Sequence, residues 1–175
     1  MKQQIIKRKD FILRPYTVKD RDALVENLNN KKVSRYLSRV LYPYNKKNAR
    51  EWLAKILKEK RKITPKFLSF AIEIDEKLAG GISFKQMMIG HKAELGYWLG
   101  EKYWGRGIMT KVVKEITKYG FKNLKLRRIY SYVPLPNIAS KRVLEKAGFE
   151  LEGILKKHSK KESKIYDAYF LAKVK

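Results

Sequence analysis

The sequence predicts a single α/β (α+β) domain spanning residues 1–175, with a mixed central sheet of about six to seven strands flanked by about four to five helices. Three observations support this fold class. The composition, 44% hydrophobic and 34% charged with 5 prolines, is that of a globular domain. Segments with apolar residues at helical spacing are interspersed with short runs rich in β-branched and aromatic residues. No repeat, low-complexity segment or linker divides the chain.

The N-terminal part is predicted to be mostly helical. Its expected elements are a strand at 10–16, a helix at 17–28, a shorter helix at 31–39 and a helix at 48–62. Pro15 ends the strand, and Thr17 with Asp20 resembles a capping box at the start of the first helix. The longest of these helices has apolar residues on one face, at positions 49, 52, 53, 56 and 57.

The rest of the chain alternates between strands and helices. Its expected elements are strands at 67–74, 78–86 and 93–100, a helix from 108, a strand at 127–133, a helix at 137–148, and strands at 149–157 and 164–174. The turn at 75–77 joins the first two strands into a hairpin. Gly148 ends the last helix. A polar, lysine-rich connection is expected between the final two strands.

Composition excludes several functional classes. The chain has no Cys, which excludes disulfides, thiolate metal sites and a cysteine acyl-enzyme. No apolar run reaches the length of about 18 residues that a membrane span needs, and residues 2–10 are charged. We therefore expect neither a membrane span nor a signal peptide, and a cytoplasmic protein that holds no metal.

The formal net charge of +25 leaves two interpretations open. A strongly basic protein is attracted to polyanions, so ribosomes or RNA are candidate partners. Alternatively, the lysines are solvated surface charges that belong to a generally lysine-rich composition. Residues 67–100 are close to neutral, so we expect no polyanion binding in that central segment.

A glycine turn precedes the long helix. Gly105 and Gly107 let the backbone turn tightly and let a ligand approach it closely. The first amides of the following helix are unsatisfied donors at the positive end of the helix dipole, which favours anions such as phosphate. A tight strand-to-helix turn without a ligand would use the same residues.

Residues 93–153 resemble the GNAT superfamily of acetyl-CoA-dependent N-acetyltransferases, and more narrowly its RimJ/RimL branch, which acetylates protein N-termini and related amines. Two motifs carry the resemblance, "YWGRGIM" at 103–109 and "NIASKRVLEKAGF" at 137–149, with a helix and a strand between them. The similar order of elements covers essentially the whole chain. The resemblance implies the GNAT acyl-CoA N-acyltransferase fold, in which the fourth and fifth strands splay apart.

The phosphate motif of the superfamily is usually written Q/R-x-x-G-x-G/A. Trp104, Gly107 and Met109 occupy its fixed positions here, and only Gly107 matches strictly. The aromatic-Gly-x-Gly variant is common in the RimJ/RimL branch, so this departure narrows the subfamily. It also puts an indole where the motif has a polar side chain.

The resemblance implies a set of residues that bind acetyl-CoA. Amides around the glycine turn would bind its pyrophosphate, and strand 93–100 would pair with its pantetheine arm through the backbone. Arg106, Lys111, Lys141 and Arg142 are either phosphate contacts or solvated charges. The predicted set is Tyr97, Trp98, Leu99, Trp104, Gly105, Arg106, Gly107, Ile108, Met109, Thr110, Asn137, Ser140 and Arg142.

Two residues are predicted to be catalytic. Acetylating an amine requires a neutral nucleophile, and Glu94 is the candidate general base, acting directly or through a water, with Glu73 as the runner-up. Ser140 would donate a hydrogen bond to the departing CoA thiolate, and the Leu99 amide would polarise the thioester carbonyl. The two histidines, His91 and His158, are expected to lie at the surface.

The resemblance leaves the acceptor open. A protein N-terminal α-amine, such as that of a ribosomal protein, is the first expectation, with direct transfer in a ternary complex. A polyamine, an antibiotic amine or a lysine side chain is the alternative within the same chemistry. A basic nucleic-acid-binding or ribosome-binding protein without catalysis, or a sensor that binds acetyl-CoA without turnover, is the alternative outside it. Both a monomer and a homodimer fit the sequence.

Overall fold

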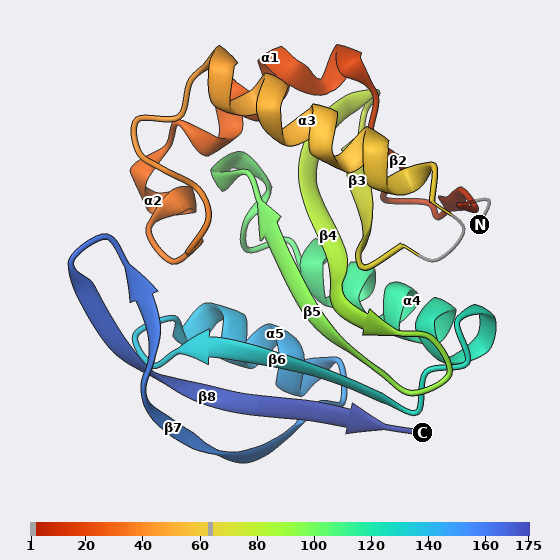
Figure 1. Ribbon diagram of the computed structural model, residues 1–175, viewed down its shortest axis with the longest axis vertical. Coiled ribbons are helices and arrows are strands. Elements are labelled where there is room, and N and C mark those ends of the chain that lie inside the picture. Colours follow the sequence, from red (N-terminus) through yellow and green to blue (C-terminus); the bar gives the residue numbers. More distant parts are fainter. Residues whose placement is uncertain (1–2, 63–64) are drawn as a thin grey trace.

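The computed structural model describes residues 3–62 and 65–175, and its elements confirm the predicted mixed α/β architecture (Figure 1). The helices are α1 (Arg21–Leu28), α2 (Lys31–Ser34), α3 (Lys46–Lys60), α4 (Ile108–Asn123) and α5 (Ile138–Lys146), with 3-10 turns η1 (Val18–Asp20) and η2 (Glu101–Tyr103). The strands are β1 (Ile6–Lys7), β2 (Ile12–Pro15), β3 (Leu68–Ile74), β4 (Lys77–Met88), β5 (Lys92–Leu99), β6 (Arg128–Pro134), β7 (Glu150–Lys161) and β8 (Lys164–Val174).

The strands form one 8-stranded sheet in the order β1-β2-β3-β4-β5-β6-β8-β7. Every neighbouring pair in this sheet is antiparallel except β5 and β6, which run parallel and are joined through α4. A parallel connection needs a crossover, and the amphipathic α4 provides it. The β5–β6 pair therefore joins an N-terminal antiparallel half to a C-terminal one.

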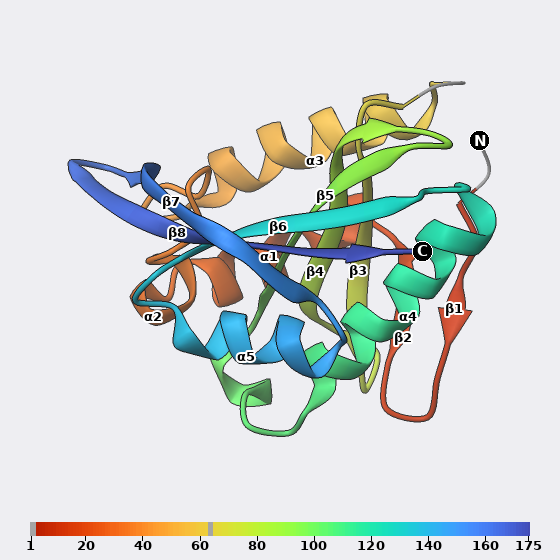
Figure 2. The same cartoon turned by 90° about the horizontal axis from the view of Figure 1, so that it is seen from below.

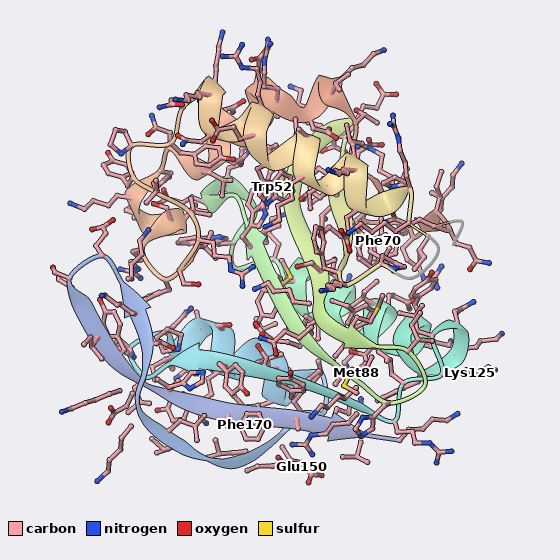
Figure 3. All side chains as sticks on the ribbon, in the orientation of Figure 1. Trp52, Phe70, Met88, Lys125, Glu150 and Phe170 are labelled. Atoms are coloured by element: carbon pink, nitrogen blue, oxygen red, sulfur yellow. The ribbon has the colours of Figure 1, made fainter. Side chains whose placement is uncertain are left out.

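Helices cover both faces of the sheet (Figures 1 and 2). On one face α4 and α5 enclose the larger core, in which Phe70 packs edge-on against Tyr119 at a centroid distance of 5.6 Å. On the other face α1 and α3 enclose a second core, where Tyr16 packs edge-on against Trp52 at 4.8 Å. Figure 3 labels Phe70 and Trp52, one from each core. Alternation along β3 sends neighbouring side chains into opposite cores.

The chain enters the first helical layer as predicted. The Thr17 amide donates to the Asp20 carboxylate at 2.8 Å, and η1 leads directly into α1, which ends at Leu28. Arg14 on β2 also contacts Asp20, through two hydrogen bonds of 2.8 and 2.9 Å, and it donates to Glu73 on β3. This partly buried network ties the start of α1 to the sheet.

The structure differs from the prediction in the number of strands, in the end of the second helix and in the start of the final turn. The sheet has one strand more than the upper bound of the prediction, because residues 6–7 pair with 12–13 to form β1. The second helix ends at Ser34, and the following residues form turns closed by the Leu37 and Val40 amides. The lysine-rich segment before residue 162 belongs to β7, since residues 159–161 pair with 164–166 of β8. Backbone pairing, with no apolar pattern to signal it, defines this end of the strand.

Within residues 3–62 and 65–175, no helix is long and apolar enough to cross a membrane. The same part of the chain holds no group of three or more His, Asp or Glu side chains arranged to bind a metal ion.

Candidate active site

The parallel strands β5 and β6 are paired at only three positions. These are Lys92 with Arg128, Ala93 with Ile129, and Glu94 with Tyr130. Beyond Glu94 the strands separate, and the Ser131 hydroxyl donates to the Leu95 carbonyl at 2.9 Å. Because β5 stays paired with β4 as far as Leu99, a gap opens between β5 and β6. This gap is the predicted separation of the fourth and fifth strands. The two strands are numbered β5 and β6 here because the unpredicted β1 precedes them.

Hydrogen-bonding groups of β5 point into this gap. The Gly100 amide donates to the Ala79 carbonyl at 2.8 Å, so Gly100 faces β4. Backbone groups alternate sides along an antiparallel strand, which directs Trp98 toward β4 and Tyr97 and Leu99 toward the gap. The predicted backbone contacts are therefore restricted to Tyr97 and Leu99. Trp98 instead lines the first cavity and packs with its side chain against the α1–α3 core.

The glycine turn leads into α4 with two left-handed residues. Gly105 has φ +73° and Gly107, the N-cap of α4, has φ +70°. Residues other than glycine rarely adopt this backbone conformation. A β-carbon added at either position would meet no atom within 4 Å. The first turn of α4 has no acidic residue and no side-chain cap. Its free amides and open surroundings form a site suited to an anion.

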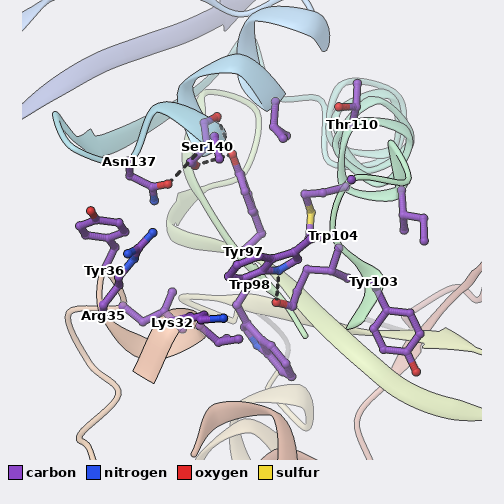
Figure 4. A pocket seen from close by; sticks show the side chains of 18 of the residues that line it. Lys32, Arg35, Tyr36, Tyr97, Trp98, Tyr103, Trp104, Thr110, Asn137 and Ser140 are labelled. Carbon is purple, nitrogen blue, oxygen red and sulfur yellow. Dashed lines mark hydrogen bonds between the residues drawn. The ribbon is translucent and has the colours of Figure 1, made fainter. Parts of the chain in front are cut away.

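A cavity of about 270 Å³ runs from this turn to the gap (Figure 4). Its walls are the segment around Val33 and Tyr36, the end of β5, the glycine turn and the start of α5. The Trp104 indole lies in this cavity and donates to the Leu99 carbonyl at 2.8 Å. Trp104, which replaces the polar residue of the superfamily motif, thus forms a hydrogen bond with one of the backbone groups that face the gap.

The start of α5 closes the other side of the gap. Asn137 is the N-cap of α5, and its side chain accepts a hydrogen bond from the Ser140 amide at 3.3 Å. The Ser140 hydroxyl lies 2.7 Å from the Tyr97 phenol, which also donates to the Ser140 carbonyl at 3.1 Å (Figure 4). Burial raises the pKa of the Tyr97 phenol above its ordinary value, although the Ser140 hydrogen bond opposes this shift.

A second cavity of about 390 Å³ lies beyond the gap and shares five lining residues with the first, namely Tyr36, Leu37, Tyr97, Asn137 and Ser140. Glu94 lines it, with 17% of its side chain exposed. The Lys85 ammonium lies 3.5 Å from a Glu94 carboxylate oxygen and extends across Gly96, whose missing side chain leaves room for it. The two cavities therefore meet at the Tyr97–Ser140 contact, with Glu94 in the second.

Aromatic side chains form the outer wall of the second cavity, and sequence reasoning missed them. The His158 ring packs on Tyr132 with centroids 4.2 Å apart, and Tyr36 meets Tyr166 edge-on at 6.2 Å. His158 is exposed as predicted, but it lies on β7 and lines the cavity. Lys161, only 9% exposed, donates to the Val40 carbonyl. The aromatic residues around β6 and β8 were the signal available in the sequence.

Several predicted residues lie outside both cavities. Arg106 and Arg142 are exposed and line neither of them. Lys111 is paired with Asp10 of the β1–β2 turn. Glu73, the alternative base, lines neither cavity and is paired with Arg14 of the neighbouring strand β2. His91 lies in the β4–β5 turn, where its carbonyl accepts from the amides of residues 127 and 128.

Comparisons with a family model, with protein sequences and with solved structures all indicate similarity to acetyltransferases. Residues 10–150 match the model of the acetyltransferase (GNAT) domain family. The N-acetyltransferase YoaA of Bacillus subtilis is 31% identical over 176 residues, covering 98% of this chain and 97% of its own. YjcK of the same organism is 44% identical over 88 residues, which is 49% of each chain. The structure of RimL, a ribosomal L7/L12 α-N-protein acetyltransferase in complex with coenzyme A, superimposes with TM-score 0.85, 25% identity and 98% coverage of both chains.

The contact between Tyr97 and Ser140 predicts energetic coupling between these two side chains. Tyr97→Phe removes the phenol and Ser140→Ala removes the hydroxyl, while the phenol keeps its bond to the residue 140 carbonyl. A net hydrogen bond is worth about 0.5–1.5 kcal/mol, so a double-mutant cycle on the free energy of unfolding should give a coupling of about that size. Urea unfolding of the wild type, both single variants and the double variant measures it. A coupling indistinguishable from zero would mean that the hydroxyl groups are not bonded in solution.

Proposed function

The chain belongs to the GNAT family of acetyltransferases, and we propose that it transfers the acetyl group of acetyl-CoA to the α-amine of a protein N-terminus. Family membership favours catalysis over the binding-only alternatives. The observation that carries the proposal is the meeting of two cavities at one gap, one ending at an anion-binding turn and the other holding Glu94. This arrangement suits direct transfer between two substrates bound at the same time.

The residues of the first cavity fit acetyl-CoA, which would supply the activated acetyl thioester. The free amides at the start of α4 match a pyrophosphate, and the open space beside Gly105 and Gly107 leaves room for it. The backbone groups of Tyr97 and Leu99 match the amides of a pantetheine arm that extends the sheet. On binding, such an arm competes with the Trp104 indole for the Leu99 carbonyl.

Within this arrangement, Glu94 removes a proton from the acceptor amine, directly or through a water. The neutral amine nitrogen then forms its bond to the acetyl carbon as the bond from that carbon to sulfur breaks, and the second proton lost by the nitrogen passes to the departing thiolate, which leaves as the CoA thiol. Ser140 donates its hydrogen bond to the departing sulfur, and the Tyr97 phenol holds the Ser140 hydroxyl in position. The Leu99 amide, which faces the gap, stabilises the carbonyl oxygen.

The charge of the second cavity supports an N-terminal acceptor over a polyamine. Arg39, Lys85, Lys160 and Lys161 line this cavity, whereas Glu94 is its one carboxylate among the described residues. A polycationic amine would face like charges, which disfavours binding. An N-terminal amine carries a single charge, and its ordinary pKa of about 7.7–8.0 demands little from the base. The likeness to RimL, named as an α-N-protein acetyltransferase, supports the same acceptor class.

A competition between acceptors tests this proposal. We expect acetylation of peptides with a free N-terminus, and much slower turnover of the same peptides with a blocked N-terminus and an internal lysine. Spermidine and an aminoglycoside should also be poor acceptors. Mass spectrometry of the products, together with release of free CoA thiol, measures each rate. Preferred turnover of a polyamine or of the internal lysine would contradict the N-terminal assignment and leave acetyl transfer itself intact.

Gly107→Glu should abolish or greatly weaken acetyl-CoA binding. The new side chain brings a negative charge to the helix start where the pyrophosphate is expected. Gly90→Glu is a matched control, because Gly90 has φ +80°, also has no atom within 4 Å of an added β-carbon, and lies in the β4–β5 turn. Both variants carry the same backbone strain and the same charge. Calorimetry should show a large loss of affinity for Gly107→Glu alone, and equal affinities in two folded variants would refute the assignment of the turn.

Glu94→Gln should lower the acetylation rate roughly 10²–10⁴-fold at neutral pH, the usual scale of general acid–base catalysis, with nearly unchanged acetyl-CoA affinity. The loss should shrink at high pH, where more of the amine is already neutral. The control Glu73→Gln changes the same side chain outside both cavities and should keep a near-normal rate.

Ser140→Ala separates support of the leaving group from base catalysis. Its defect should persist at high pH and shrink with an acyl donor whose thiolate leaves more easily. If Glu94→Gln turns over normally at neutral pH with every accepted amine, Glu94 is not the base and the site only positions the neutral fraction of the amine.

A further inference from the structure

We infer that a groove along the C-terminal half of α4 binds the phosphodiester backbone of a nucleic acid. This lysine groove has a volume of about 460 Å³ and is formed by α4, the segment that follows it and the end of β8. Its charged lining residues are Lys114, Lys118, Lys122, Lys125, Lys173 and Lys175, and its lining includes no acidic residue. Figure 3 labels Lys125 at this end of α4.

Among the described residues, the groove gathers six lysines without an acidic partner on one concave surface, whereas the unpaired Lys47, Lys55 and Lys58 of α3 line none of the three cavities. Elsewhere, Lys32 pairs with Glu101 at 2.6 Å, and Lys141 pairs with Glu145 one helical turn away. Within residues 3–62 and 65–175, none of the six groove lysines forms an ion pair. Their unpaired charges therefore sum over one concave surface, which makes a polyanion the fitting ligand.

Three of the lysines form a regular row. Lys114, Lys118 and Lys122 are each four residues apart on α4, so they lie on one face at intervals of roughly 6 Å. Like charges at this spacing destabilise an isolated helix by a few tenths of a kcal/mol per pair, a cost that a bound polyanion removes. Evenly spaced charges are the property of a nucleic-acid strand, whereas the carboxylates of an acidic protein have no fixed interval.

The floor of the groove adds an apolar surface to its charged rim. Phe121 contributes a partly buried ring. A nucleic-acid strand offers sugar and base groups beside its phosphates, and aromatic rings are common contacts for bases. An anionic bilayer would offer only a flat surface, which the hollow shape of the groove does not match.

The groove shares no lining residue with the two cavities of the active site. It begins about two turns after the glycine turn and continues to the opposite end of α4. Binding of a nucleic acid there leaves acetyl-CoA and acceptor access open. The inference consequently does not depend on the identity of the acceptor.

The test compares two triple variants with equal loss of charge. Lys114→Gln, Lys118→Gln and Lys122→Gln remove the row in the groove. Lys47→Gln, Lys55→Gln and Lys58→Gln remove three exposed lysines of α3, on the opposite side of the sheet. Binding of a fluorescent single-stranded RNA and a DNA of equal length is measured by anisotropy across a range of salt concentrations. Thermal unfolding and acetyl-CoA affinity verify that both variants are folded.

We expect the wild type and the α3 variant to bind both strands alike, because the phosphodiester backbone is common to them. The α4 variant should bind more weakly at low salt. Its plot of log affinity against log salt should be shallower by about two, since each lost phosphate contact removes about 0.7 from the slope for a single strand. Equal weakening by both variants would mean diffuse attraction to the net charge and would overturn the inference. So would an unaffected α4 variant, or a wild type that binds neither strand at low salt.

Discussion

The active site depends on one constraint, the early end of pairing between the parallel strands β5 and β6. Three residue pairs join them, and beyond Glu94 the backbone of β5 keeps its partner β4 on one side only. Groups of Tyr97 and Leu99 then face a gap, and buried backbone groups without partners are costly. The Trp104 indole already satisfies the Leu99 carbonyl. The same gap brings two cavities into contact, so this parallel strand pair provides both the free edge of β5 and the meeting point that the proposed transfer uses.

The two cavities obtain their electrostatic character by different means. At the glycine turn, the proposed pyrophosphate site, the backbone amides and the dipole of a 16-residue helix suit an anion without a required lysine. In the second cavity the local charge comes from side chains, with Lys85 next to Glu94 and with Arg39, Lys160 and Lys161 also in the lining. The proposed mode of cofactor binding therefore accounts for little of the net charge of +25. A large share of that charge is free to act elsewhere on the surface.

Helix α4 contributes to the candidate active site, to the larger core and to the lysine groove. Its N-terminus follows the glycine turn proposed to bind the pyrophosphate, its apolar face fills the larger core, and its exposed face carries the row of lysines that lines the groove. A rigid helix of this length separates the two anion sites by roughly 10–20 Å. The two sites can thus be occupied together, and changes in one row of side chains leave the other end of the helix intact.

The sequence by itself determined the mixed fold, the glycine turn, the apolar face of α4 and the Asn137 cap, because each depends on residues close together in the chain. Tertiary structure decided what depends on distant segments. In the folded chain Glu94 lines a cavity, whereas Glu73 forms an ion pair with Arg14, although the sequence predicts both as carboxylates on strands. The tertiary structure brought His158 to a cavity wall through pairing of a polar strand. It also joined lysines of α4 to those of β8, about fifty residues later, because only the folded sheet makes these segments neighbours.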